Sequence, residues 1–244
     1  MIKINNLTKK YKDKLAVDNL NLEIKTGELF SLLGTNGAGK TTTIKMLSTL
    51  ILPTSGEVEI NNLDLVKDSS KIKEIINISP QETAVASNLT VLENLYFMAG
   101  IYQIPNKEDK IKELIKLFKL EEVLKQKAKT LSGGYQRKLS IAISLINNPK
   151  ILFLDEPTLG LDVISRHDLW KIIEALKGKT TIILTTHYME EAEALSDRIG
   201  IMNKGKLIEL GTSKELIKKA KTKNFEDAFI KIIDEDNDEN TNIC

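Results

Sequence analysis

The chain has 244 residues, 41% of them hydrophobic, and can bury a substantial core as one large domain or as a domain with an inserted lobe. Its 35 lysines and arginines balance 34 aspartates and glutamates, so the overall charge of +1 recruits neither nucleic acid nor anionic lipid; we expect no nucleic-acid partner and only local phosphate binding. The single cysteine, Cys244, excludes a disulfide framework and a cysteine metal cluster, and no apolar run approaches the roughly 20 residues that span a bilayer.

The N-terminal part shows alternating apolar and polar residues in three stretches, 2–7, 15–24 and 58–65. Alternation with a period of two gives a strand one buried and one exposed face. We therefore expect a small antiparallel sheet beside the main core.

A glycine-rich loop follows the apolar run at 29–33, which itself predicts a buried strand. Residues 34–41 read Gly-Thr-Asn-Gly-Ala-Gly-Lys-Thr and match the phosphate-binding pattern G-x-x-x-x-G-K-[ST]. Ile44, Leu47, Leu50 and Ile51 then recur at helical spacing, so the loop leads into a helix N-terminus, which attracts phosphate. An ordinary glycine-rich turn with a surface lysine is the alternative, and the strand-to-helix setting argues against it.

This loop supplies the predicted ATP contacts, because glycines let successive N–H groups point at phosphate oxygens. Lys40 adds a charge between the β- and γ-phosphates, and the Thr41 hydroxyl is a ligand for Mg²⁺. The expected cofactors are therefore ATP and Mg²⁺. The predicted ATP-binding residues of the loop are Gly34, Thr35, Asn36, Gly37, Ala38, Gly39, Lys40, Thr41 and Thr42.

The middle of the chain, 86–149, is predicted to be a helical lobe inserted into the core. Its clearest helix carries Ile111, Leu114, Ile115 and Phe118 on one face and charged residues on the other. After the lobe, 151–154 and 182–184 are continuous apolar runs of the kind buried in a parallel sheet. Helical periodicity over 169–176 predicts the crossover between them. The core is therefore α/β.

Two acids, Asp155 and Glu156, end the strand at 151–154, where ligands of open α/β sheets bind. Asp155 suits Mg²⁺ through water, and Glu156 can polarise the water that attacks the γ-phosphate. A pair of acids at a strand end is ordinary by itself and gains its meaning from the glycine-rich loop.

The C-terminal part begins with Thr212 and Glu215, a capping box that predicts a last helix over 216–219. We expect an ATP-binding domain over residues 1–220 and a short tail over 221–244. The tail ends in an acidic stretch that we expect to be solvated or disordered.

Residues 131–137, Leu-Ser-Gly-Gly-Tyr-Gln-Arg, lie just upstream of Asp155 and resemble the signature motif of ABC transporter ATPases. Further matches follow in the family's order: Tyr11 as the adenine-stacking aromatic, Gln81 as the loop glutamine, 159–162 as the D-loop and His187 as the switch histidine. The resemblance implies a P-loop NTPase core of the RecA-like type with a small antiparallel β subdomain and an inserted α-helical subdomain.

The resemblance also implies how the site works. It implies that two chains pack head to tail as a homodimer, so that Ser132, Gly133 and Gly134 contact ATP in trans, on the partner's glycine loop. Glu156, His187 and Gln81 are the implied catalytic residues; Gln81 also joins Thr41 and Asp155 at Mg²⁺, and Asp162 links the two sites of the dimer. Tyr135 and Val163 differ from the residues most common in the family at their positions.

The segment 185–199 with the short tail resembles subunits that serve drug, antibiotic or sodium efflux. This implies an ATP hydrolase at the cytoplasmic face of the cell membrane, peripheral to it, that powers export by separate membrane-spanning permease subunits. We expect such a partner to dock near residues 81–92. The alternatives are a subunit of an importer or of a lipid or lipoprotein system, and, less favoured, a soluble ABC protein acting on ribosomes or DNA.

Overall fold

The computed structural model describes residues 1–241, so Cys244 lies outside the described residues. The strands, in chain order, are β1 (Ile2–Tyr11), β2 (Lys14–Ile24), β3 (Leu29–Gly34), β4 (Ser55–Ile60), β5 (Leu63–Asp64), β6 (Ile76–Ser79), β7 (Ile151–Asp155), β8 (Thr181–Thr186), β9 (Arg198–Asn203) and β10 (Lys206–Gly211). The α-helices are α1 (Lys40–Leu47), α2 (Ser69–Ile75), α3 (Val91–Ile101), α4 (Lys107–Phe118), α5 (Gly133–Ser144), α6 (Val163–Leu176), α7 (Met189–Leu195), α8 (Ser213–Ala220) and α9 (Phe225–Thr241). Two short 3₁₀ helices, η1 (Glu121–Val123) and η2 (Ala128–Thr130), connect α4 to α5.

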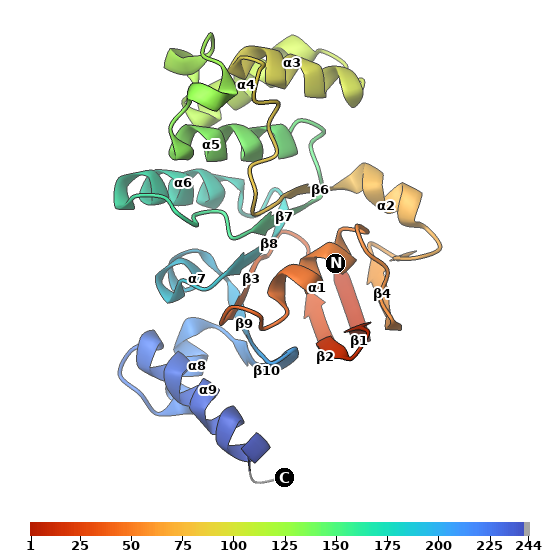
Figure 1. The fold of residues 1–244 in the computed structure, drawn as a ribbon, viewed down its shortest axis with the longest axis vertical. Coiled ribbons are helices and arrows are strands. Elements are labelled where there is room, and N and C mark those ends of the chain that lie inside the picture. Colours follow the sequence, from red (N-terminus) through yellow and green to blue (C-terminus); the bar gives the residue numbers. More distant parts are fainter. Residues whose placement is uncertain (242–244) are drawn as a thin grey trace.

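A six-stranded sheet in the order β10-β9-β3-β8-β7-β6 forms the centre of the molecule (Figure 1). Its strands run parallel except β10, which pairs antiparallel with β9 at the edge. Every residue of β3, β7 and β8 is buried, as expected of parallel strands covered on both faces. The parallel register also aligns the carboxyl ends of β3, β7 and β8 at one edge of the sheet.

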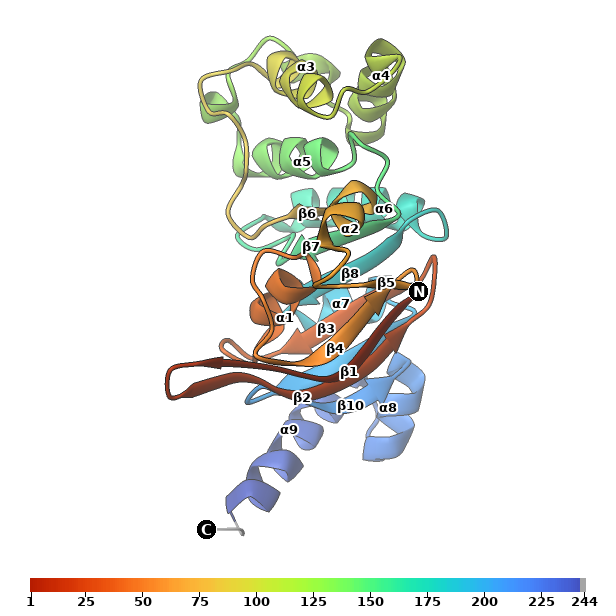
Figure 2. The same cartoon turned by 90° about the vertical axis from the view of Figure 1, so that its right-hand side faces the viewer.

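The predicted antiparallel sheet is confirmed as β2-β1-β4-β5. It packs with α1 against one face of the central sheet, and their shared core includes Ile4, Ile24, Phe30, Phe153 and Ile183. The hairpin of β1 and β2 extends well beyond the central sheet (Figure 2).

The helical lobe between β6 and β7 is formed by α3, α4 and α5 at one end of the molecule (Figures 1 and 2). Ile111, Leu114 and Phe118 are buried along α4, as their spacing predicts, while Ile115 is half-buried. The lobe shares a continuous core with α6 and with the second face of the central sheet. Hence the lobe is anchored to the sheet through α5 and α6.

The C-terminal end corrects one expectation. The capping box of Thr212 and Glu215 is confirmed at the start of α8. The acidic stretch, expected to be solvated or disordered, forms the last part of helix α9 as far as Thr241, where the described residues end. Phe225, Ala228, Phe229 and Ile232 bury one stripe of this helix against α7, α8 and β9. Burial of that stripe stabilises the helix despite its charge.

A second correction concerns α1, which ends at Leu47 although the helical spacing continues to Ile51. Thr49 adopts a left-handed backbone (φ 61°), and the N–H groups of Leu50 and Ile51 both donate to the carbonyl of Lys45. The chain therefore turns out of the helix one turn early. Among the described residues, no helix combines the length and apolarity that crossing a bilayer requires.

Candidate functional site

The glycine-rich loop connects the carboxyl end of β3 to the first residue of α1, as predicted. Gly37 and Gly39 have positive φ angles of 82° and 104°, which favour glycine. A Cβ atom on Gly39 would come within 2.5 Å of the carbonyl oxygen of Ala16, so the loop also packs too tightly against β2 for a side chain there. The loop is therefore shaped by backbone constraints before any ligand binds.

Lys40 is 5% exposed, and its amino group lies inside the loop. Its Nζ donates to the carbonyl oxygens of Gly34 (2.7 Å) and Thr35 (3.2 Å) and lies 3.4 Å from Oε1 of Glu156. Burial lowers the pKa of Lys40, and the Glu156 carboxylate opposes that shift. A buried ammonium facing a small cavity is suited to bind an anion such as a phosphate.

Asp155 and Thr41 offer the oxygen ligands that Mg²⁺ prefers. Oγ1 of Thr41 donates to Oδ1 of Asp155 over 3.0 Å, which brings the loop and the end of β7 together. The hydroxyl of Thr185 in β8 donates to the same carboxylate oxygen, so the Asp155 side chain is fixed from the neighbouring strand. A hydroxyl beside a buried carboxylate fits the predicted magnesium site in its donor chemistry.

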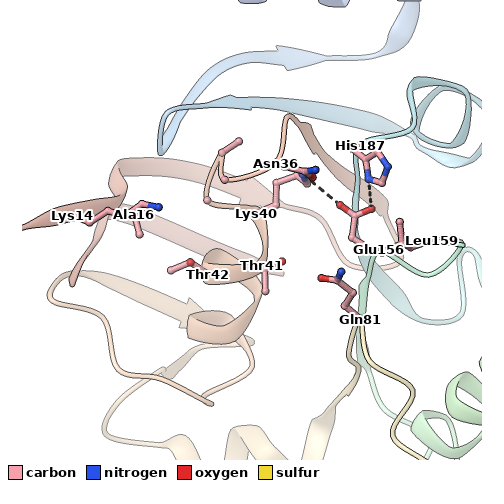
Figure 3. Close-up of a pocket in the computed structure, with 13 residues that line it drawn as sticks. Lys14, Ala16, Asn36, Lys40, Thr41, Thr42, Gln81, Glu156, Leu159 and His187 are labelled. Carbon is pink, nitrogen blue, oxygen red and sulfur yellow. Dashed lines mark hydrogen bonds and ion pairs between the residues drawn. The ribbon is translucent and has the colours of Figure 1, made fainter. Parts of the chain in front are cut away.

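Glu156 lies between Lys40 and His187 at the end of β7 (Figure 3). Its Oε2 is 2.8 Å from Nδ1 of His187, and its backbone N–H donates to the carbonyl oxygen and hydroxyl of Thr185, both over 3.1 Å. Its φ angle of 48° is unusual for a residue other than glycine, and such strain is typical of functional sites. The structure thus holds this carboxylate in one position from several sides.

These groups line a cavity of about 400 Å³. Its wall consists of Lys14, Ala16, Asn36, Gly37, Ala38, Gly39, Lys40, Thr41, Thr42, Gln81, Glu156, Leu159 and His187. The Gln81 side chain points toward Thr41 and Glu156 from the segment after β6 (Figure 3). Asp155 lies just behind this wall, 3% exposed. The cavity therefore brings together the predicted loop residues 36–42 with Glu156, Gln81 and His187, whereas the predicted residues Gly34 and Thr35 do not line it.

Comparison with known proteins decides which P-loop class this is. A family profile described as "ABC transporter" matches residues 17–159. The chain belongs to the ABC transporter family. Its predicted fold class is confirmed by solved ATP-binding cassettes of this family.

Several ABC proteins resemble the chain in sequence. It is 43% identical over 218 residues to the phospholipid-transporting ATPase ABCA3 of Homo sapiens, and the alignment covers 87% of this chain but 13% of that protein. It is 39% identical over 252 residues to the probable multidrug ABC transporter ATP-binding protein YbhF of Escherichia coli, covering 99% of this chain and 43% of that protein. The linearmycin resistance ATP-binding protein LnrL of Bacillus subtilis is 40% identical, over 88% of this chain and 70% of its own length. The chain thus spans less than half of ABCA3 and YbhF.

Solved structures of ABC transporter cassettes resemble the fold of this chain. An ATP-binding subunit of an ABC transporter superposes with a TM-score of 0.85 at 26% identity, over 95% of this chain and 99% of its own. The ATP-binding cassette MJ0796, solved as a dimer in a post-hydrolysis state with ADP and Pi, superposes with a TM-score of 0.79 at 30% identity, over 87% of this chain and 98% of its own.

The ABC signature residues lie away from the cavity. Ser132 caps α5 in the helical lobe by accepting a hydrogen bond from the N–H of Tyr135 (3.4 Å), and Ser132 and Gly133 are exposed. Gly134 packs against α6, where an added Cβ would meet Oγ of Ser165 at 2.8 Å. None of the three signature residues lines the cavity. The structure therefore separates them from the chain's own glycine loop.

Asp162 and Tyr11 complete the predicted set. Asp162 caps α6: its carboxylate accepts from the N–H groups of Ile164 and Ser165 (3.0 Å each) and from the Ser165 hydroxyl (2.7 Å). Tyr11 ends β1 at the hairpin tip, 45% exposed, and Lys14 and Ala16 line the cavity instead. The adenine contact of Tyr11 and the dimer contact of Asp162 remain predictions.

Arg137 is a residue of the site that sequence reasoning missed. The side chain is 5% exposed and donates to the backbone carbonyls of Pro80 (2.5 Å), Asp155 (2.8 Å) and Pro157 (2.8 Å), and to that of Gln81 (3.3 Å). Burial lowers its pKa to about 10, so it stays charged at neutral pH. Its place in the signature segment was visible in the sequence, but no local pattern indicates these partners.

Thr185 was missed as well. It is one of three threonines in strand β8, and its hydroxyl contacts both the Asp155 carboxylate and the backbone N–H of Glu156. Its position two residues before His187 was the available signal.

Proposed function

We propose that this cassette, with Mg²⁺, hydrolyses ATP as half of a dimer and powers export through separate membrane-spanning subunits. The observation that carries the chemistry is the placement of Glu156, whose carboxylate faces the cavity between Lys40 and His187. Thr41, Asp155 and Gln81 are the residues that would hold Mg²⁺, which supplies charge neutralisation at the phosphates when bound.

The chain's own residues have separable roles in this proposal. Lys40 holds the terminal phosphates, and Glu156 orients the attacking water and accepts its proton. Because Nδ1 of His187 faces Glu156, Nε2 is the nitrogen left to contact the γ-phosphate. In this arrangement His187 both fixes the base and senses the phosphate.

The proposed dimer follows from the finding that the signature residues do not line the cavity of their own chain. Ser132 and Gly133 present an exposed helix N-terminus on the lobe, and helix N-termini bind phosphate. A second copy packed head to tail would bring this N-terminus to the first copy's glycine loop. The dimeric state of the MJ0796 cassette supports this reading.

Export is favoured by the names of two relatives, a probable multidrug transporter protein and a linearmycin resistance protein. The resemblance to phospholipid-transporting ABCA3 favours lipid transport as a second candidate. In either case we place the chain at the cytoplasmic face of the cell membrane, peripheral to it and bound to permease subunits.

The docking surface for such a subunit is proposed around the segment 81–92 and α3. Tyr96, Phe97 and Ile101 of α3 are 39%, 54% and 56% exposed, although they are large and apolar. Val85, which lies within the segment 81–92 that the sequence suggested, is half-buried against the lobe core. The exposed face of α3 is therefore the better candidate for the contact itself.

The proposed chemistry is tested by comparing Lys40→Ala with Glu156→Gln. We expect Lys40→Ala to lose ATP binding in a fluorescent-nucleotide titration. Glu156→Gln should keep that affinity and lose hydrolysis by about 10² to 10⁴-fold, as expected for a general base. Equal loss of affinity in both variants would contradict the assignment.

A further inference from the structure

A buried acid behind the site has no role in the chemistry described above. Glu191 lies in α7, four residues after His187, and its side chain is fully buried. Trp170 of α6 donates its indole N–H to Oε1 of Glu191 over 3.0 Å. Carboxylates are almost never fully buried without a partner for each oxygen, so this position needs an explanation.

The second oxygen of Glu191 gives the explanation. Its Oε2 is buried and has no hydrogen-bond partner, and the same holds for Oγ1 of Thr158. The two residues are neighbours, since the Thr158 hydroxyl is close enough to influence the pKa of Glu191. If Glu191 carries a proton, it offers one donor besides its acceptors, and a small rotation pairs Oε2–H with Thr158.

The surroundings favour the protonated form. Burial is the largest influence and raises the pKa of Glu191, and the negative charge of Glu156 raises it further. The nearby hydroxyls of Thr186 and Thr158 and the indole N–H of Trp170 lower the pKa of Glu191, but their influence is weaker than that of burial. A neutral acid also avoids placing a second carboxylate charge near Glu156.

Glu191 connects three parts of the site. Its own helix, α7, begins two residues after His187; Trp170 belongs to α6; and Thr158 lies in the turn two residues after Glu156. A second contact joins α6 to the segment that carries His187, because the Arg166 guanidinium of α6 lies over the rings of both Trp170 and Tyr188. Behind the cavity, Glu191 and Arg166 thus lie where three segments meet: helix α6, the turn after Glu156, and the segment with His187 and Tyr188.

We infer that Glu191 is a positioning residue for ATP hydrolysis, which acts as a neutral bridge between Trp170 and Thr158 and keeps His187 aligned with Glu156. The inference rests on the proposed roles of Glu156 and His187. It assigns Glu191 no contact with ATP, so its loss should slow hydrolysis without weakening nucleotide binding.

The test uses the full chain and compares Glu191→Gln with Glu191→Ala. The amide of glutamine has nearly the shape of a protonated carboxyl and offers an acceptor oxygen for Trp170 and an NH₂ donor group for Thr158. We expect Glu191→Gln to keep kcat within about twofold, and Glu191→Ala to lower kcat at least about tenfold with KM for ATP unchanged, because small misplacements of reacting groups are costly. The emission maximum of Trp170, the only tryptophan, should match the natural chain in the Gln variant and shift in the Ala variant.

Controls separate the possible outcomes. Glu193→Gln changes an exposed glutamate of the same helix and should leave kcat, KM and emission unchanged. If Glu191→Ala does not fold, Thr158→Val decides, and a several-fold lower kcat with unchanged KM is expected. Glu191→Gln as slow as Glu191→Ala, a rise in KM in parallel with the loss of kcat, or a natural kcat in Thr158→Val would each overturn the inference. Glu156→Gln is measured alongside, since hydrolysis retained there refutes the proposed function whatever Glu191 shows.

Discussion

Replacement of Arg137 by methionine tests whether the site is held together from the helical lobe. The methionine keeps much of the side-chain volume and removes the hydrogen bonds to the carbonyls of Pro80, Asp155 and Pro157, which measure 2.5–2.8 Å. Those carbonyls belong to three separate segments: the one that carries Gln81, the end of β7 and the turn after it.

The magnitude follows from opposing effects. Hydrogen bonds to a charged group contribute about 1.5–3 kcal/mol each, so three of them give roughly 4.5–9 kcal/mol. Burial of the guanidinium offsets part of this by several kcal/mol, in line with the lowered pKa of Arg137. We therefore expect Arg137→Met to lower the free energy of unfolding by about 3–5 kcal/mol, the usual cost of breaking a buried polar network.

Urea unfolding followed by circular dichroism measures this change. The matched control is Lys116→Met, an exposed lysine on a helix of the same lobe, which should change stability by less than about 0.5 kcal/mol. Under conditions where Arg137→Met remains folded, its ATPase rate should fall because Gln81 and Glu156 lose their common support. A stability loss below about 1 kcal/mol, or an unchanged ATPase rate in the folded variant, would refute the reasoning.

Three further predictions follow from the same structure. Glu191→Gln should change the pH dependence of stability: because burial raises the pKa of Glu191, the folded chain keeps this proton above the ordinary pKa of 4.5, and the natural chain loses stability relative to the Gln variant as the pH rises above that value. Unfolding free energies from urea titrations that change equally with pH in the two proteins would show that Glu191 is not buried as a neutral acid. Phe97→Glu should leave the isolated cassette folded and able to bind ATP but reduce co-purification with its permease, whereas Lys116→Glu should not; the reverse pattern would place the docking contact elsewhere on the lobe. Mixing Lys40→Ala with Ser132→Arg chains leaves one intact composite site in each mixed dimer. If that site can act alone, ATPase activity should recover to at most about a quarter of the natural rate, because about half of the dimers are mixed and each has one of two sites intact. ATPase activity in either variant by itself would exclude sites shared in trans.

Local patterns predicted those parts of the fold that short-range chemistry decides. The glycine loop, the buried strands at 29–33, 151–154 and 182–184, and the capping box at Thr212 each depend on residues within a few positions of one another. Alignment of parallel strands then explains why Asp155, Glu156 and His187 meet at one edge of the sheet.

The remaining features depend on contacts that are distant in sequence. Arg137 bonds to carbonyls 18, 20 and 57 residues away, and no local periodicity indicates such partners. Helix α9 is rich in acidic residues, but it also carries a buried apolar stripe with the i, i+3, i+4, i+7 spacing of a helix, formed by Phe225, Ala228, Phe229 and Ile232. Composition alone suggested disorder there, and packing against α7 and α8 decided otherwise.

Nucleotide-driven dimerisation tests the central claim most directly. In Glu156→Gln, which should bind ATP without hydrolysing it, size-exclusion chromatography with light scattering should show a monomer without nucleotide and a dimer with ATP. Adding Ser132→Arg should abolish that dimer, because the exposed N-terminus of α5 would no longer fit the partner's bound nucleotide. A chain that stays monomeric with ATP under all conditions, or a dimer that forms equally well without ATP and with Ser132→Arg, would contradict the account.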